Sequence, residues 1–160
     1  MKFTLIKKLS QDKSMRPILT GLLLFTLLYI LSDILVKYVN FGVFPDAINV
    51  TLFGDEEQYI DPLSTSAFLE FWHVEIFFIM MILLTLSAVF VRVSKDDTSK
   101  TILLSALMIC ALFSLISLVL AFFVAKIFVL IYSILFFIWH AIAVYMILYS
   151  LGKLYYDKSI

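Results

Sequence analysis

The sequence predicts an all-α integral membrane protein, an antiparallel bundle of four transmembrane helices, and three observations lead to this fold class. First, 63% of the 160 residues are hydrophobic and 15% are charged, whereas ordinary soluble domains are about half apolar and a quarter charged. Second, four segments are long and apolar enough to cross the roughly 30 Å hydrocarbon core of a bilayer. Third, basic and acidic residues fall into different connecting segments.

The four predicted spans cover about residues 17–39, 67–91, 101–123 and 127–152, and 17–152 therefore form one transmembrane domain. Pro17 suits the first turn of the first span, where its missing N–H group costs nothing. Three residues separate the last two spans, and such a short connection requires a tight antiparallel hairpin.

Residues 1–16 precede the first span and form a basic arm. Four lysines and one arginine alternate there with apolar residues, including Phe3, Leu5 and Ile6. This pattern is typical of a short amphipathic helix that lies at the membrane surface. We expect the arm to be retained, because the apolar run after it is too long for a signal peptide and no small-residue cleavage site follows.

Residues 40–66 connect the first two spans and carry five acidic residues but no basic residue. Turn-forming residues divide this acidic loop, namely Gly42, Pro45, Gly54 and Pro62. Residues 48–53 between them have strand-like character. The loop is therefore predicted to be ordered, as a short hairpin or as a cap over the bundle.

The distribution of basic residues predicts the orientation. Of twelve lysines and arginines, five lie in residues 1–16, three in the 92–100 loop and two in the 153–160 tail. Basic residues remain on the cytoplasmic side of a membrane. We therefore expect cytoplasmic N- and C-termini, a non-cytoplasmic 40–66 loop and a location in a bacterial inner membrane.

The third span carries a stripe of small residues at three- and four-residue steps, which places them on one helix face. We predict that this stripe packs closely against the fourth span, with Leu115 on the opposite face. The single cysteine belongs to the stripe, so it is interpreted as a packing residue rather than a reactive thiol. The stripe comprises Ala106, Cys110, Ser114, Ser117 and Ala121.

The second span begins with three ionisable residues, Glu70, His73 and Glu75. Glu70 is expected near the membrane interface, about 5 Å below the start of the span, whereas His73 and Glu75 lie deeper. Each helical residue turns by about 100°, which places Glu75 about 200° around the helix from His73. These two side chains are therefore expected to face different neighbours.

The first and fourth spans add Asp33, Lys37 and His140. Asp33 and Lys37 are four residues apart and predict an ion pair near the outer interface, with Lys37 reaching outward to the headgroups. The alternative is that Asp33 meets His73 or Glu75 across the bundle. His140 lies about 20 Å into its span, close to mid-bilayer, as either a hydrogen-bonded structural residue or a functional one.

These polar residues allow three functional hypotheses. His73 and His140 could bind haem b as axial ligands in an electron-transfer protein, although they differ in depth by about 11 Å. Glu70, His73 and Asp33 could hold a copper or zinc ion. A descending series of Asp33, Glu75, His73 and His140 could conduct protons or ions.

A fourth interpretation needs no cofactor. The chain lacks the motifs of nucleophilic, phosphate-binding, zinc-protease or dinucleotide sites, and the spans leave no room for a soluble catalytic domain. The sequence therefore favours a non-enzymatic accessory or structural subunit of an inner-membrane complex. Its expected partners are the lipid bilayer and other membrane protein subunits or copies of itself, and not nucleic acid.

Overall fold

The computed structural model of the chain describes residues 15–94 and 98–156, and these form five helices. They are α1 (Met15–Asn40), α2 (Pro45–Phe53), α3 (Thr65–Val93), α4 (Thr98–Phe123) and α5 (Ile127–Tyr156). All except α2 are long and apolar enough to cross a membrane. Within the described ranges no β-strand occurs, and the prediction of an all-α membrane bundle with four spans is confirmed. Most of the predicted basic arm, residues 1–14, lies outside the described residues.

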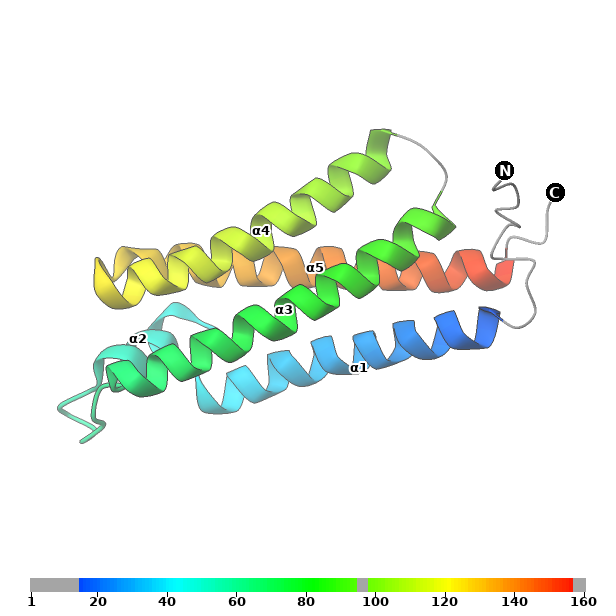
Figure 1. Cartoon of the computed structure of the whole chain (residues 1–160). Coiled ribbons are helices and arrows are strands. Elements are labelled where there is room, and N and C mark those ends of the chain that lie inside the picture. Colours follow the sequence, from blue (N-terminus) through cyan, green and yellow to red (C-terminus); the bar gives the residue numbers. More distant parts are fainter. Residues whose placement is uncertain (1–14, 95–97, 157–160) are drawn as a thin grey trace.

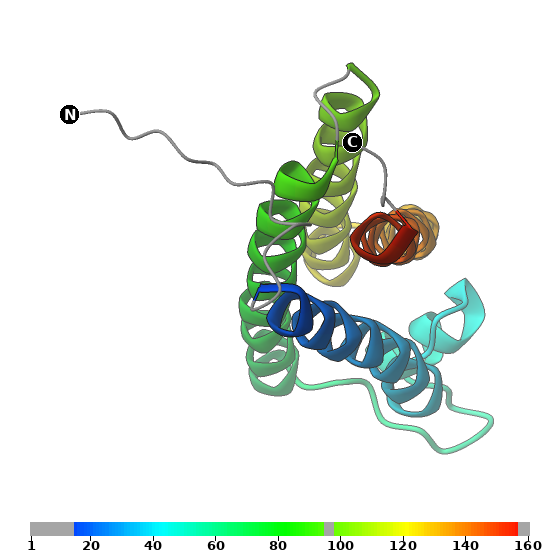
Figure 2. The same cartoon turned by 90° about the vertical axis from the view of Figure 1, so that its right-hand side faces the viewer.

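The four long helices run antiparallel in the order α1, α3, α4 and α5 around the bundle (Figures 1 and 2). The end that carries residues 41–64 is called the cap end here. The opposite end, where α1 begins and α5 ends, is called the basic end, because Arg16, Arg92, Lys100 and Lys153 lie there. At the basic end, the Thr20 hydroxyl lies 3.1 Å from the Tyr155 hydroxyl and joins α1 to α5.

Helix α1 stops short of the cap ends of its neighbours α3 and α5 (Figure 1). Gly42 lies two residues after the end of α1, with a φ of 90°, and its N–H donates to the Lys37 carbonyl over 2.6 Å. A Cβ at Gly42 would lie 2.7 Å from the Cβ of Ala47. Only glycine combines this backbone conformation with so close an approach, and the chain therefore turns sharply back toward the bundle.

Residues 41–53 fold over the space that the short α1 leaves, and we call this segment the cap. Phe41 and Val43 are buried, as are Ile48 and Leu52 of α2. The Ser133 hydroxyl of α5 donates to the Val43 carbonyl, which anchors the segment. The strand-like interpretation of residues 48–53 is wrong, because Pro45 begins a helix there and Asp46 lies favourably in its first turn.

Gly42→Ala is expected to lower the free energy of unfolding by about 1 to 3 kcal/mol, since a side chain must adopt a positive φ against Ala47. Protease cutting near residues 55–60 should accelerate as the cap loosens. Gly21→Ala is the matched control: nothing lies within 4 Å of its Cβ position, and alanine favours the helix. Equal stability of the two variants, measured by unfolding in mixed micelles, would contradict a structural role of Gly42.

The buried apolar residues form two clusters, one above the other. The cluster at the cap end joins the cap to α3, α4 and α5 through Phe41, Ile48, Phe68 and Phe136 among others. The larger cluster fills the bundle toward the basic end and includes Leu23, Leu86, Trp139 and Met146. The candidate site lies at the level where the two clusters meet.

Candidate functional site: a buried ionic tetrad

Four ionisable side chains from three helices meet inside the bundle, and we call them the tetrad: Asp33 and Lys37 of α1, Glu75 of α3 and His140 of α5. The Lys37 ammonium lies at the centre. Its Nζ donates to Asp33 Oδ2 over 2.9 Å and to Glu75 Oε2 over 2.7 Å. Lys37 is 3% exposed and His140 2%, so these pairs are isolated from solvent and form a buried rather than a surface ion-pair network.

The two ring nitrogens of His140 are both engaged. Nδ1 lies 2.8 Å from the carbonyl oxygen of Phe136, four residues earlier on the same helix. A carbonyl can only accept, and Nδ1 must therefore carry a hydrogen. Nε2 lies 3.0 Å from Asp33 Oδ2, so one further proton must lie between these two atoms. The tetrad then holds two acidic and two basic groups and is neutral as a whole.

Aromatic rings of α5 pack against the tetrad. Lys37 Nζ lies 5.0 Å from the centre of the Phe136 ring, within the range of a cation–π contact. The rings of Phe136 and Trp139 lie 4.0 Å and 3.7 Å from the His140 ring, centre to centre. Tyr132 is buried in the same region of α5. The imidazole is thereby held between large side chains of its own helix and cannot turn freely.

The position of the tetrad follows from the short α1. Asp33 lies about 10 Å from the end of α1, whereas His140 lies about 20 Å from the start of α5. Contact between them requires α1 to end about 10 Å below the cap end of α5, and the cap covers this difference. Lys37, close to the end of its helix, is buried at this level, and its carbonyl accepts from the N–H groups of Phe41 and Gly42 in the cap. The apolar clusters close the tetrad on both sides.

The predicted Asp33–Lys37 ion pair is confirmed, but two related expectations are wrong. Lys37 does not reach outward to the headgroups: it points into the bundle and bridges to Glu75. Asp33 does meet a residue across the bundle, but that residue is His140 and not His73 or Glu75. The sequence therefore does not identify Lys37 as a site residue. The signal for it is the presence of two acids within spans, Asp33 and Glu75, because buried acids need a nearby cation.

The opposite placement of His73 and Glu75 agrees with their predicted separation around α3. Glu75 is buried, whereas His73 and Glu70 are exposed on the outward side of the helix. The structure therefore does not bring His73 and His140 together. His140 offers no unoccupied ring nitrogen to iron, because both contact protein oxygens. The geometry gives no haem b ligand pair from these two residues.

The proposed metal ligands are also apart. Asp33 is engaged by Lys37 and His140, while Glu70 and His73 face outward. Among residues 15–94 and 98–156, no group of three or more His, Cys, Asp or Glu side chains has a geometry that could hold a metal ion. Asp33, Glu75 and His140 of the proposed proton series lie in one compact cluster, and His73 lies outside it. The four residues therefore do not form a line that descends through the membrane.

The small-residue stripe of α4 lies partly at the α4–α5 interface. Ser114, Ser117 and Ala121 are buried, whereas Ala106 and Cys110 are half-buried. Leu115, expected on the opposite face, is buried as well. Its carbonyl accepts from Trp72 Nε1 of α3 over 3.1 Å. The packing face of α4 is therefore broader than the stripe, because α4 contacts both α3 and α5.

Comparison with known proteins places the chain in a family but gives no individual relative. No curated protein and no solved structure matches it. A family profile matches residues 42–159, a region that contains Glu75 and His140 but begins after Asp33 and Lys37. Because this match covers well over half of the sequence, the chain belongs to the Aq_1264_TM family, whose members share a transmembrane helical domain.

Proposed function

We propose that the protein is a non-enzymatic accessory or structural subunit of a membrane complex, and that the outward face of α3 contacts its partner. The observation that carries the proposal is the position of His73. It lies on the outward face of a transmembrane helix, in line with the exposed Phe77 and Met80. An imidazole that faces lipid has no hydrogen-bond partner there, whereas a helix of another protein can supply one.

The length of α3 indicates the depth of His73. Its 29 residues span about 43 Å, against a hydrocarbon core of about 30 Å. About 6 Å at each end therefore extends into the interfacial regions. Glu70, five residues from the start, lies near this boundary, and His73 lies about one turn below it. A hydrogen bond from a partner would therefore stabilise His73 more than Glu70, because Glu70 lies closer to water.

The tetrad supports a structural role in the same proposal. Its charges are used for pairing one another, and they tie α1, α3 and α5 together. Transmembrane helices gain little from the hydrophobic effect among themselves, so polar contacts and close packing hold them in place. The neutral cluster would keep α3 at a fixed angle and present its outward face to the partner.

Photocrosslinking in native membranes tests the partner proposal. A photoreactive residue at Phe77, which is 52% exposed, should give a discrete heavier product, and one at Phe25 of α1, 75% exposed, should not. The protein joined at Phe77 should copurify in mild detergent, and His73→Leu should weaken its retention about tenfold, as for the loss of one intramembrane hydrogen bond. Products containing only lipid, or equal products at both positions, would refute the proposal.

We also infer that the basic end faces the cytoplasm of a bacterial inner membrane. Arg16, Arg92, Lys100 and Lys153 support this orientation, because basic residues are retained on the cytoplasmic side. The acidic residues of the 40–64 segment lie at the cap end, which would face outward.

Cysteine labelling of intact cells is expected to distinguish the two ends. Tyr59→Cys at the cap end and Tyr156→Cys at the basic end replace residues that are 95% and 89% exposed. A membrane-impermeant maleimide should label Tyr59→Cys in intact cells, but Tyr156→Cys only after the membrane is opened. The half-buried native Cys110 supplies the background signal. The reverse pattern would overturn the orientation.

A further inference from the structure

Helix α4 diverges from α5 toward the basic end of the bundle (Figures 1 and 2). A cavity of about 290 Å³ opens there between α3, α4 and α5. Its lining combines lysine, serine and tyrosine side chains with an apolar floor. The residues that line it are Phe90, Ser94, Ser99, Lys100, Leu103, Tyr145 and Tyr149.

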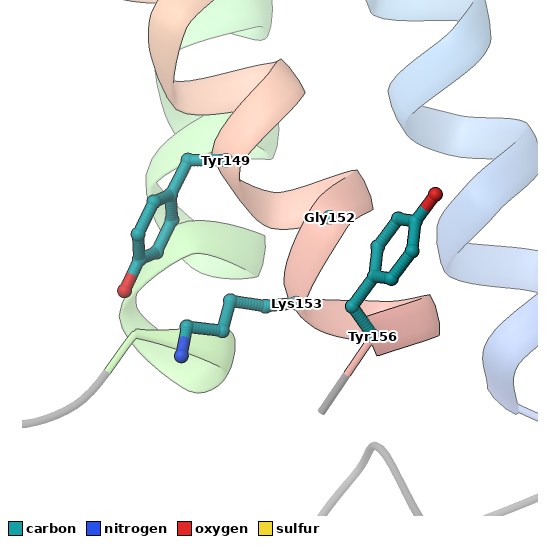
Figure 3. Close-up of a pocket in the computed structure, with 4 residues that line it drawn as sticks. All are labelled: Tyr149, Gly152, Lys153 and Tyr156. Carbon is teal, nitrogen blue, oxygen red and sulfur yellow. The ribbon is translucent and has the colours of Figure 1, made fainter. Parts of the chain in front are cut away.

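A second cavity of about 320 Å³ adjoins the first, and Tyr149 lines both. Figure 3 shows Tyr149 and Lys153 extending from one face of α5 toward the end of the bundle, while Tyr156 points the other way, toward α1. Lys153 Nζ lies 5.9 Å from the Tyr149 ring centre. Gly152 leaves the space beside Tyr149 and Lys153 open, since no atom of another side chain lies within 4 Å of its Cβ position.

Lys100 of α4 lines one cavity and Lys153 of α5 lines the other, and both cavities share Tyr149. Two ammonium groups, a phenol and the Ser99 hydroxyl are donors suited to phosphate oxygens. Ser99, Lys100 and Lys153 lie within about one turn of helix ends, which is the level of the lipid headgroups, and Tyr149 lies about two turns from the end of α5 with its hydroxyl pointing toward that end (Figure 3). Basic pockets between transmembrane helices at this level bind anionic headgroups.

We propose that this opening between α3, α4 and α5 binds the phosphate of an anionic phospholipid. Lys100 and Lys153 contact the phosphate from two sides, and Ser99 and the Tyr149 hydroxyl donate to its remaining oxygens. Phe90 and Leu103 line the same opening and form an apolar floor on which the first carbons of the acyl chains rest. This floor distinguishes a lipid from a soluble phosphate, which gains nothing from it. The proposal is independent of the proposed partner of α3.

The test uses the full-length protein in detergent micelles and native mass spectrometry. It is titrated with phosphatidylglycerol, with phosphatidylcholine of the same acyl chains and with glycerol 3-phosphate. Phosphatidylglycerol should bind in a one-to-one complex, more tightly than either comparison ligand. Lys100→Gln and Lys153→Gln should each weaken its binding about fivefold, the loss associated with one basic residue at a membrane surface, and the double variant about 25-fold.

Lys126→Gln is the matched control, because Lys126 lies at the cap end over the Phe53 ring, and its phosphatidylglycerol affinity should equal that of the unaltered protein. Circular dichroism and gel filtration confirm that each variant is folded. Equal binding of phosphatidylglycerol and phosphatidylcholine, unchanged affinity in the double variant, or an equal loss in Lys126→Gln would overturn the site. Glycerol 3-phosphate binding as tightly as the lipid would overturn the assignment to a phospholipid.

Discussion

Lys37→Met is expected to lower the free energy of unfolding by about 3 to 5 kcal/mol, the cost of removing one partner from a buried ion-pair network. The methionine fills a similar volume, so lost packing contributes little. The loss arises because Asp33 and Glu75, at 2.9 Å and 2.7 Å from Lys37 Nζ, then share a single cation, His140. One carboxylate is left without a partner in an apolar interior.

The double variant Lys37→Met/Glu75→Met should recover most of this loss. It removes one positive and one negative charge, and it leaves the Asp33–His140 pair neutral. Replacement of complete buried ion pairs by apolar residues is often neutral or stabilising. Unfolding in mixed micelles of mild detergent and dodecyl sulfate measures the unaltered protein, Lys37→Met, Glu75→Met and the double variant. If the losses of the single variants simply add in the double variant, the groups do not act as one charge-balanced unit.

Lys126→Met provides the control for the loss of a lysine as such. Its ammonium is exposed and lies 4.6 Å from the Phe53 ring centre. Loss of an exposed cation–π contact costs less than about 1 kcal/mol. A similar destabilisation by Lys37→Met and Lys126→Met would mean that the burial of the tetrad has little energetic effect.

The fold could be predicted from the sequence because membrane spans depend on long-range composition rather than on precise contacts. Each span was placed within four residues of its observed ends, since a bilayer fixes the length of apolar helix required. The opposed faces of His73 and Glu75 were also predictable, because 100° per residue is a property of a single helix.

The tetrad could not be predicted in the same way, because it depends on how far one helix slides along another. Depths counted from helix ends placed Asp33 near the interface and His140 near mid-bilayer, yet the two side chains are 3.0 Å apart. The missing information was the early end of α1 at Asn40 and the fold of residues 41–53 over it. Gly42 indicates that the chain turns at this point. The sequence does not show the direction of the turn, which depends on the contact of Gly42 with Ala47.

Because one proton lies between Asp33 and His140, the two acids of the tetrad should respond differently when each is replaced by its amide. Asp33→Asn should cost at most about 2 kcal/mol, because it removes one negative charge together with the proton that Asp33 shares with His140, and the tetrad stays neutral. The asparagine amide nitrogen in the position of Oδ2 can donate to His140 Nε2, and Lys37 keeps its hydrogen bond to Glu75 Oε2.

Glu75→Gln should cost about 3 to 5 kcal/mol, although it also converts one buried acid into an amide. Asp33 still requires the proton at His140 Nε2, and the tetrad is left with one uncompensated positive charge. Nitrogen NMR of the ¹⁵N-labelled imidazole reads the proton directly. Both ring nitrogens should be protonated in the unaltered protein, whereas Asp33→Asn should retain the hydrogen on Nδ1 alone, which donates to the Phe136 carbonyl. An unprotonated Nε2 in both proteins, with equal losses of stability in the two variants, would show that no proton is held between Asp33 and His140.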